Sequence, residues 1–258
     1  MVRPRLACKR NLDYSYAMTN DTFDILFLIA RPAAGKSEII DYLKRASEME
    51  RRQRFHIDAF DEIDDFPMLW TWFEEDALLE GMGEPRLHSD ADGYFLHDYL
   101  WHVLIERMAL DYSKLLRETP DYHASHTTIV EFARGAQHGG WQTAFAHFPA
   151  EMLRRGAILY INVSWEESLR KNRGRFNPDR PDSILEHALP DEKMERLYRD
   201  SDWEEFSAGD PEFVTINEVS VPYAVFENED DVTTARGPAL GKRLEETLVR
   251  LWALRAIR

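Results

Sequence analysis

The sequence holds a single cysteine, Cys8, among its 258 residues. One thiol excludes an internal disulfide and any metal site built from several cysteines, as is usual in a reducing compartment. The chain also lacks an apolar run near the roughly 20 residues that a membrane-spanning helix needs, and its N-terminal segment lacks the apolar centre of a secretory signal. We therefore expect a cytoplasmic protein that does not enter a membrane.

Positive charge is scarce relative to negative charge. The chain carries 32 lysines and arginines against 47 aspartates and glutamates, a formal net charge of −15. Binding to nucleic acid or to anionic lipid depends on basic side chains that neutralise phosphates, so this balance argues against either partner. A small molecule is the expected ligand, and we expect the chain to act as a monomer or a homodimer.

The apolar segments have the length and spacing of an α/β protein. Hydrophobic residues make up 44% of the chain, enough for a large core in one domain. Short apolar runs alternate with amphipathic stretches, which predicts a single domain, 1–258, of the three-layer α/β/α class with a mostly parallel five-stranded sheet. We predict strands at 24–30, 54–60, 127–132 and 157–163, and a pair of strands at 213–216 and 221–226.

Three segments differ from this pattern. Residues 1–20 show no period and are interpreted as an N-terminal extension. Residues 62–95 are interpreted as an acidic insertion, helical in its first half, whose charge favours a neutral or cationic ligand. Residues 165–203 are rich in arginine and interrupted by proline, as expected of a lid.

The most informative motif directly follows the first predicted strand. A tight loop between a strand and a helix aims backbone N–H groups at phosphate oxygens, and the helix dipole favours their negative charge. Gly35 lets the backbone approach, Lys36 reaches the β- and γ-phosphates, and the Ser37 hydroxyl can bind Mg²⁺. This Walker A pattern, with alanine at its first position, predicts binding of ATP and Mg²⁺ by the segment Ala30-Arg31-Pro32-Ala33-Ala34-Gly35-Lys36-Ser37.

Transfer of a phosphoryl group also needs a side chain that orients or deprotonates the attacking hydroxyl. Asp58 is the first candidate because it lies near the C-terminal end of the second predicted strand, at the sheet edge where the phosphate loop is expected. Asp61 competes for the same role or for binding the acceptor. The alternative for both is a structural one, a helix cap or a solvated turn carboxylate.

Two residues near the end of the third predicted strand are further candidates. Glu131 is suited to hold Mg²⁺ through water or to contact the acceptor, and Arg134 to grip the acceptor. A buried carboxylate paired with an arginine for structural reasons is the equally weighted alternative.

Three arginines lie close together at the start of the predicted lid. Arg170, Arg173 and Arg175 are predicted to clamp the phosphates of ATP, with Arg173 as the first choice for the charge that develops on the transferred group. The alternative is a solvated helix surface with salt bridges to Glu166 and Glu167.

With these residues in view, the chain resembles the P-loop kinase superfamily, the nucleoside- and nucleotide-kinase-like group that includes adenylate, shikimate and gluconate kinases. The resemblance implies a P-loop NTPase fold. It also implies that Lys36 and Ser37 bind ATP and magnesium, that Asp58 engages the acceptor hydroxyl, and that Arg173 contacts phosphates. The chain has no Asp-Gly-x-Pro-Arg stretch like that of adenylate kinases, and its second predicted strand carries Asp58-x-x-Asp61 where shikimate kinases have Asp-x-Asp, so the acceptor stays unnamed.

Two functions follow from this sequence. The first is an ATP-dependent kinase that transfers the γ-phosphoryl group to a small hydroxyl- or phosphate-bearing acceptor. The second is a nucleotide-binding regulator or slow NTPase without an acceptor. The chain lacks the Asn-Lys-x-Asp sequence with which GTPase switches read guanine, and this favours the kinase.

Overall fold

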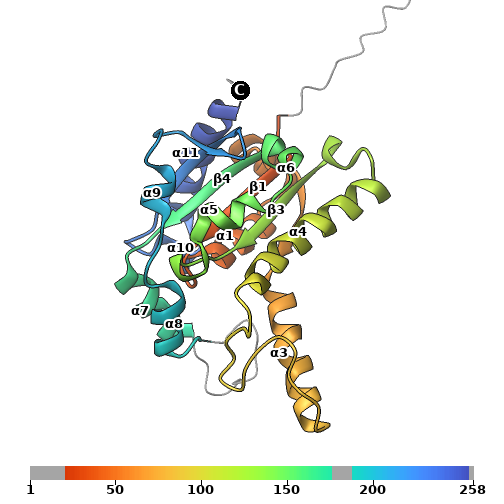
Figure 1. The fold of residues 1–258 in the computed structure, drawn as a ribbon. Coiled ribbons are helices and arrows are strands. Elements are labelled where there is room, and N and C mark those ends of the chain that lie inside the picture. The colour runs from red at the N-terminus through yellow and green to blue at the C-terminus, as the bar shows by residue number, and fades with distance from the viewer. Residues whose placement is uncertain (1–20, 176–187, 256–258) are drawn as a thin grey trace, which may run out of the picture.

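One six-stranded sheet runs through the centre of the molecule (Figure 1). The computed structural model describes residues 21–175 and 188–255. In spatial order the strands are β2 (Ala59–Asp64), β3 (His126–Phe132), β1 (Ile25–Ala30), β4 (Gly156–Asn162), β6 (Val219–Glu227) and β5 (Phe213–Ile216). All are parallel except β5, which pairs antiparallel with β6. A mostly parallel sheet is therefore confirmed.

The paired strands expected at 213–216 and 221–226 are present as β5 and β6, so the sheet has six strands and the predicted count of five is wrong by one. The sixth strand, β5, joins β6 through a turn in which Asn217 and Glu218 both have positive φ, 48° and 65°. A two-residue turn of this hand matches the twist of antiparallel strands. The hairpin therefore adds an antiparallel edge to the sheet.

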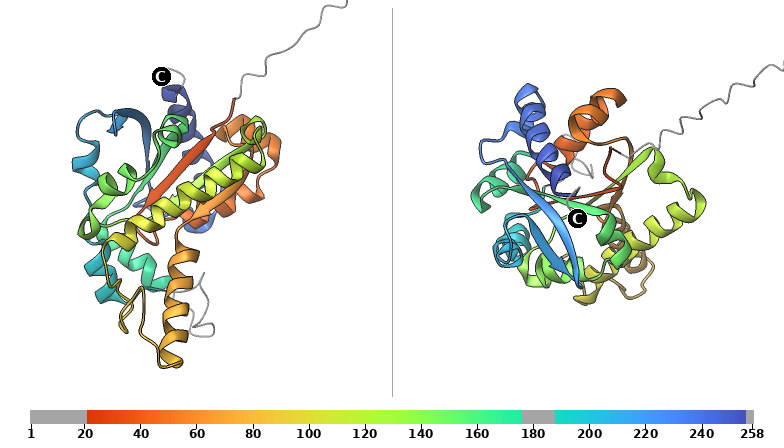
Figure 2. Two further views of the ribbon diagram at one scale, coloured as in Figure 1. Left: turned by 45° about the vertical axis from the view of Figure 1, so that its right-hand side comes forward. Right: turned by 90° about the horizontal axis from the view of Figure 1, so that it is seen from above.

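The side chains of β1 alternate between two helical layers, which cover the sheet on both sides (Figure 2). Ile25, Phe27 and Ile29 belong to one buried cluster, and residues 26, 28 and 30 belong to the other. The first layer contains α4 (Tyr99–Glu118), α5 (Gly140–Ala146), α6 (Ala150–Arg155) and α9 (Trp203–Ser207), and the second contains α1 (Lys36–Arg45) and α11 (Pro238–Arg255). The α/β class with three layers follows.

The remaining helices are short or lie outside the two layers. These remaining helices are α2 (Glu48–Glu50), the π-helix η1 (Arg51–Phe55), α3 (Phe66–Gly81), the 3₁₀ turns η2 (Tyr122–Ala124) and η3 (Ala136–His138), α7 (Trp165–Arg175), α8 (Asp191–Tyr198) and α10 (Val232–Ala235). None of the helices within 21–175 and 188–255 has the length and apolarity to cross a membrane.

The order of the strands places a ligand site at β1. From β1 the chain passes to the edge strand β2 and returns to β3, and it then crosses β1 to reach β4 on the other side. In parallel α/β sheets the crevice for ligands lies at the carboxyl ends of the strands where this direction reverses. The loop of residues 31–35 leaves β1 at that position.

The second strand lies later in the chain than the sequence indicates. Residues 54–60 were expected to form it, but η1 ends at Phe55, His56 turns the chain with φ of 54°, and β2 begins at Ala59. Phe55 and Ile57 are fully buried among the helices, and their apolar alternation imitates a strand. The true strand is half-exposed and rich in acidic residues, so its pattern is weak.

The boundaries of the insertion and the lid also change. Residues 62–64 complete β2, and the inserted segment begins with α3, which projects away from the sheet (Figure 1). The predicted lid, 165–203, contains α7 and α8. Its residues 176–187, and the N-terminal extension 1–20, lie outside the described residues.

Candidate functional site

The loop after β1 has the backbone shape of an anion site. Ala33 and Gly35 have φ of 58° and 119°, the left-handed region in which successive N–H groups can converge on an anion. A Cβ on Gly35 would lie 2.7 Å from Thr233 Oγ1, so a larger residue does not fit. Lys36 and Ser37 begin α1, and Gly35 has no side chain to cap it. The first N–H groups of α1 therefore face the crevice without a side-chain cap at Gly35.

Arg31, predicted to contact ATP, instead fastens the loop to the protein. Its guanidinium donates hydrogen bonds to the carbonyl oxygens of Val163, Tyr198 and Arg199 at 3.1–3.2 Å. These three acceptors lie after β4 and at the end of α8. The side chain is thus a structural brace, and only the backbone of this residue remains for a ligand.

Two backbone carbonyls of the loop accept hydrogen bonds from side chains elsewhere in the chain. Ser168 Oγ on α7 donates to the Pro32 carbonyl at 2.8 Å, and Asn228 Nδ2 donates to the Ala34 carbonyl at 2.8 Å. Because these two carbonyls are hydrogen-bonded, the orientation of their peptide groups in the loop is fixed. Preorganised N–H groups bind charge more strongly than mobile ones.

A cavity of about 180 Å³ opens in front of this loop. Its lining comes from the ends of β1, β2 and β3, or the residues just after them, and from α1, α3, α4, α7 and α8. The side chains able to bind phosphate, metal or a proton are Lys36, Ser37, Asp64, Asp65, Glu131, Arg134, Asn172 and Arg175. The structure therefore brings together four of the predicted charged residues, Lys36, Glu131, Arg134 and Arg175, and adds Asp64 and Asp65.

Asp64 and Glu131 form a carboxylate pair at the carboxyl ends of β2 and β3, where they are directly opposite in register. Burial and the neighbouring charges of Glu131 and Asp65 raise the pKa of Asp64 to about 8, although Lys36 opposes the shift. Burial likewise raises the pKa of Glu131 against the effect of Lys36. Two carboxylates so close together favour a shared proton or a cation.

The pair fits Mg²⁺ by its chemistry. Glu131 Oε2 is buried and has no hydrogen-bond partner among the described residues, so it is an oxygen ligand without another use. Ser37 lines the same cavity. No group of three or more His, Cys, Asp or Glu side chains suited to a metal occurs in the described part of the chain. Mg²⁺ commonly binds through one or two carboxylates together with phosphate oxygens.

Arg134 reaches the cavity but is already paired. Its guanidinium donates to Asp65 Oδ2 at 2.6 Å and to the Trp101 carbonyl at 3.2 Å, and both partners of the ion pair are buried. This is the structural alternative foreseen for the residue. With its charge balanced by Asp65, Arg134 shapes the wall of the cavity.

The expected position of Asp58 at the phosphate loop is wrong. Asp58 precedes β2, at the amino end of the sheet, where it is 1% exposed and pairs with Arg52 at 2.6 Å. Asp61 lies within β2 and accepts a hydrogen bond from Tyr122 Oη at 2.8 Å. Neither lines the cavity. Since β2 begins at Ala59, Asp64 occupies the place predicted for Asp58.

Only one of the three lid arginines reaches the cavity. Arg170 pairs with Glu167 and Asp231, and Arg173 pairs with Asp191; both arginines are exposed. The choice of Arg173 is therefore not supported by its position, because the ion pair with α8 directs it elsewhere. Arg175, at the end of α7, lines the cavity, with Nη2 3.6 Å from Glu38 Oε2.

Sequence reasoning missed Asp64 and Asn172. Asp64 is one of four acidic residues in the stretch Asp61-Glu62-Ile63-Asp64-Asp65, and only a correct strand boundary distinguishes it. Asn172 lies between the predicted arginines and had no motif to mark it. Pro67, in the first turn of α3, is the available signal for the end of β2, since proline is favoured in the first turn of a helix.

Comparisons with known proteins give little further information. No protein-family model matches the chain, and no curated protein matches it. Among solved structures, the chain is similar to the crystal structure of TT1252 from Thermus thermophilus, with 15% identity and a TM-score of 0.41 over 89% of this chain and 95% of the other. Similarity at this level says nothing about chemistry, so the functional assignment depends on the geometry of the site.

Proposed function

We propose that this protein is a P-loop kinase that transfers the γ-phosphoryl group of ATP to a hydroxyl group of a small acceptor. One observation carries the proposal. The uncapped start of α1, with Lys36 and Ser37, faces the same cavity as the carboxylate pair of Asp64 and Glu131. An anion site and a site for a base or cation thus share one crevice, as phosphoryl transfer requires.

Each side chain has a role that suits its surroundings. The loop N–H groups and Lys36 bind the β- and γ-phosphates, and Arg175 binds the γ-phosphate from α7. Ser37 and Glu131 hold Mg²⁺, which supplies positive charge to the phosphate oxygens when it is bound. The acceptor oxygen bonds to the γ-phosphorus, the bond from that phosphorus to the β–γ bridging oxygen breaks, ADP leaves, and Asp64 accepts the hydroxyl proton.

The environment of Asp64 suits a base. A carboxylate with a pKa near the working pH accepts a proton more readily than one of ordinary pKa. Burial and the adjacent Glu131 give Asp64 this property. The neighbouring Asp65 is instead held in a buried ion pair with Arg134.

The test is ADP release measured against sugars, nucleosides, amino alcohols and hydroxy acids, together with ATP binding by calorimetry. Lys36→Ala should weaken ATP binding by about tenfold or more, since it removes a charged phosphate contact. Asp64→Asn should abolish acceptor-dependent ADP release and leave ATP binding in place. Asp61→Asn, the same change on the same strand outside the cavity, is the matched control.

Three outcomes would contradict the proposal. A wild-type protein that binds no ATP in the presence of Mg²⁺ would exclude the phosphate site altogether. ATP binding without any acceptor dependence across the panel would favour the nucleotide-binding regulator or slow NTPase. Equal turnover of Asp64→Asn and Asp61→Asn would exclude Asp64 as the base.

A further inference from the structure

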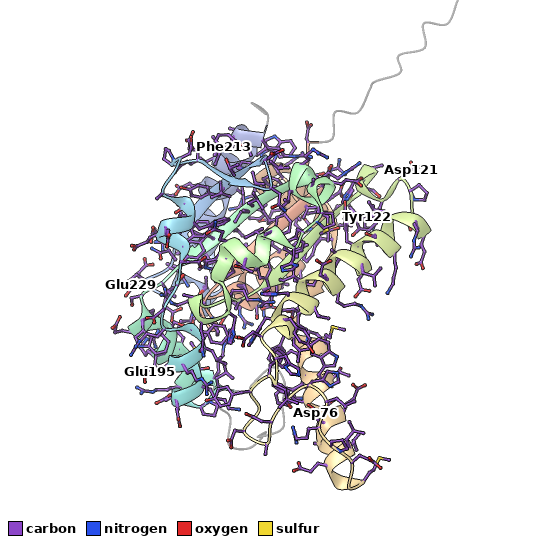
Figure 3. The ribbon with its side chains drawn as sticks, in the orientation of Figure 1. Asp76, Asp121, Tyr122, Glu195, Phe213 and Glu229 are labelled. Atoms are coloured by element: carbon purple, nitrogen blue, oxygen red, sulfur yellow. The ribbon has the colours of Figure 1, made fainter. Side chains whose placement is uncertain are left out.

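A second cavity, of about 330 Å³, lies beside the first and is lined mainly by aromatic side chains. We call it the aromatic pocket and define it by Phe66, Trp70, Phe73, Phe95 and Trp101. Its walls come from α3, from the segment before α4, and from α8. Figure 3 labels Asp76 on α3 and Glu195 on α8, the two helices that flank it. Such walls favour a flat apolar ligand over a sugar, which needs many hydrogen bonds.

The aromatic pocket borders the candidate active site. Phe66, Leu69, Trp101, Leu189 and Tyr198 line both cavities. A molecule in the pocket therefore lies next to the cavity that Asp64 and Lys36 line. The pocket is thus placed to hold the acceptor of the proposed kinase.

His138 offers this pocket an unused hydrogen-bonding group. Its side chain is 10% exposed and stacks on Trp101 with ring centroids 4.8 Å apart. Neither ring nitrogen has a hydrogen-bond partner among the described residues, and the nearest carboxylate oxygen, Asp98 Oδ1, is 3.6 Å from Nδ1. Burial lowers the pKa of His138. A neutral ring provides one donor and one acceptor for a polar group of the ligand.

The mouth of the pocket carries two cations from α8. Lys193 Nζ and the Arg196 guanidinium lie over the ring of Tyr94, 5.1 and 4.2 Å from its centroid. No carboxylate of the described residues is recorded in an ion pair with either, and Asp98 is the one acidic residue in the pocket lining. Cations held in place without a carboxylate favour an anionic ligand group.

This local charge differs from the expectation based on the insertion. The acidic composition of 62–95 favours a neutral or cationic compound, but Asp76, its most buried acid, binds the backbone N–H groups of residues 87–89. The Asp76 carboxylate is therefore hydrogen-bonded within the insertion and does not face a ligand. The walls that face the pocket carry more positive than negative charge.

We propose that the acceptor is a hydroxyl compound with a flat apolar body and an anionic group, seated in the aromatic pocket with its anion on Lys193 and Arg196. This assignment rests on the proposed kinase function for the hydroxyl. The apolar and anionic features rest on the pocket alone.

The test uses two fluorescent probes without ATP. One is 8-anilinonaphthalene-1-sulfonate, which is flat, apolar and anionic, and the other is N-phenyl-1-naphthylamine, its neutral analogue. The anionic probe should bind one site per chain. The double variant Lys193→Ala/Arg196→Ala should weaken it by about tenfold, as expected for lost charge-assisted contacts, and leave the neutral probe unchanged. Trp70→Leu should weaken both probes.

Arg199→Ala is the matched control, because Arg199 is also exposed near the end of α8 but pairs with Glu195. Equal loss of both probes in the double variant, or no loss of either, would overturn the anion site. Binding unaffected by Trp70→Leu would overturn the apolar site, with His138→Ala as a second wall variant if the first does not fold.

A final arm separates this assignment from the kinase proposal. Lys36→Ala should not change probe binding, since Lys36 lines only the first cavity. Any acceptor that drives ADP release should displace the anionic probe, and turnover without displacement would place the acceptor elsewhere. Specific probe binding without ADP release from any acceptor would instead contradict the kinase and leave the pocket assignment standing.

Discussion

Asp64 and Asp65 are neighbours in the chain, yet their surroundings give them opposite roles. Asp65 is buried against Arg134 at 2.6 Å, so its charge is balanced. Asp64 faces Glu131, and the two carboxylates repel each other. A balanced pair stabilises structure, whereas an unbalanced carboxylate is available for a proton or a metal.

The two substitutions should therefore separate stability from activity. Asp65→Asn leaves the buried charge of Arg134 uncompensated and should lower the free energy of unfolding by about 3 kcal/mol. Asp64→Asn removes a repulsion and should leave that free energy unchanged or higher in the ligand-free protein. Urea denaturation of both variants at neutral pH checks this, and a large loss for Asp64→Asn would refute the proposed repulsion.

Arg173 and Arg175 form a second matched pair. Arg175→Ala removes a cation from the cavity and should lower turnover by about a hundredfold, the usual scale for loss of a charge that stabilises the transition state. Arg173→Ala breaks only an exposed ion pair with Asp191 and should change turnover by less than about threefold. Steady-state kinetics with a working acceptor measures both, and the reverse ranking would favour the choice made from sequence.

At the residue scale, the sequence predicts where the backbone places a residue better than it predicts which group the side chain of that residue contacts. Gly35, Lys36 and Ser37 are placed as expected because a glycine between a buried strand and a helix has few alternatives. The partners of Arg31 and Arg173 were not predictable, since Tyr198 and Asp191 lie far along the chain and meet them only after folding.

Among the elements, α3 is attached to the following segment by a buried carboxylate, in addition to the ring contacts of Trp72 with His88 and of Phe73 with Phe95. Asp76 is fully buried and accepts hydrogen bonds from the backbone N–H groups of Leu87, His88 and Ser89. Burial alone would raise the pKa of Asp76, but these hydrogen bonds outweigh it and hold that pKa well below its usual range. The stabilisation is therefore present above about pH 4 and is lost as the pH falls further.

Asp76→Asn should destabilise the protein by about 2–4 kcal/mol at neutral pH, because it places an amide N–H₂ against backbone donors. The difference from wild type should shrink as the pH falls below about 4, because the carboxyl of the unfolded wild-type chain gains a proton there while the folded one remains charged. Thermal unfolding of both proteins across this range measures the effect. A difference that stays constant with pH would mean that the charge of Asp76 contributes nothing.

The elements differ in how well their sequence predicts them. Strands β1, β3 and β4 are buried on both faces. Apolar runs predict β1 and β4, and the β-branched residues of 127–132 predict β3. Strand β2 lies at the edge with acidic residues on it, so Phe55 and Ile57 gave a stronger but false signal. Because the second strand was predicted too early in the chain, Asp58 was chosen as the base in place of Asp64.

In the whole molecule, a net charge of −15 surrounds the site proposed to bind ATP. At long range ATP meets a repulsive field, and the local cations act only within about a Debye length, roughly 10 Å at 0.1 M salt. The association rate of a fluorescent ATP analogue should therefore rise by about twofold between about 20 and 200 mM KCl. Stopped-flow mixing measures this rate, with the neutral naphthylamine probe as an insensitive control. A falling rate would show that local cations dominate the approach.

Helix α8 touches both cavities. The carbonyl of Tyr198, its last residue, accepts a hydrogen bond from Arg31 that fastens the phosphate loop. Lys193 and Arg196 of the same helix line the aromatic pocket. Whatever occupies one cavity therefore restrains a wall of the other, and the entropic cost of that restraint is shared between two ligands. Nucleotide and acceptor should accordingly bind cooperatively, with the same gain in affinity whichever is added first.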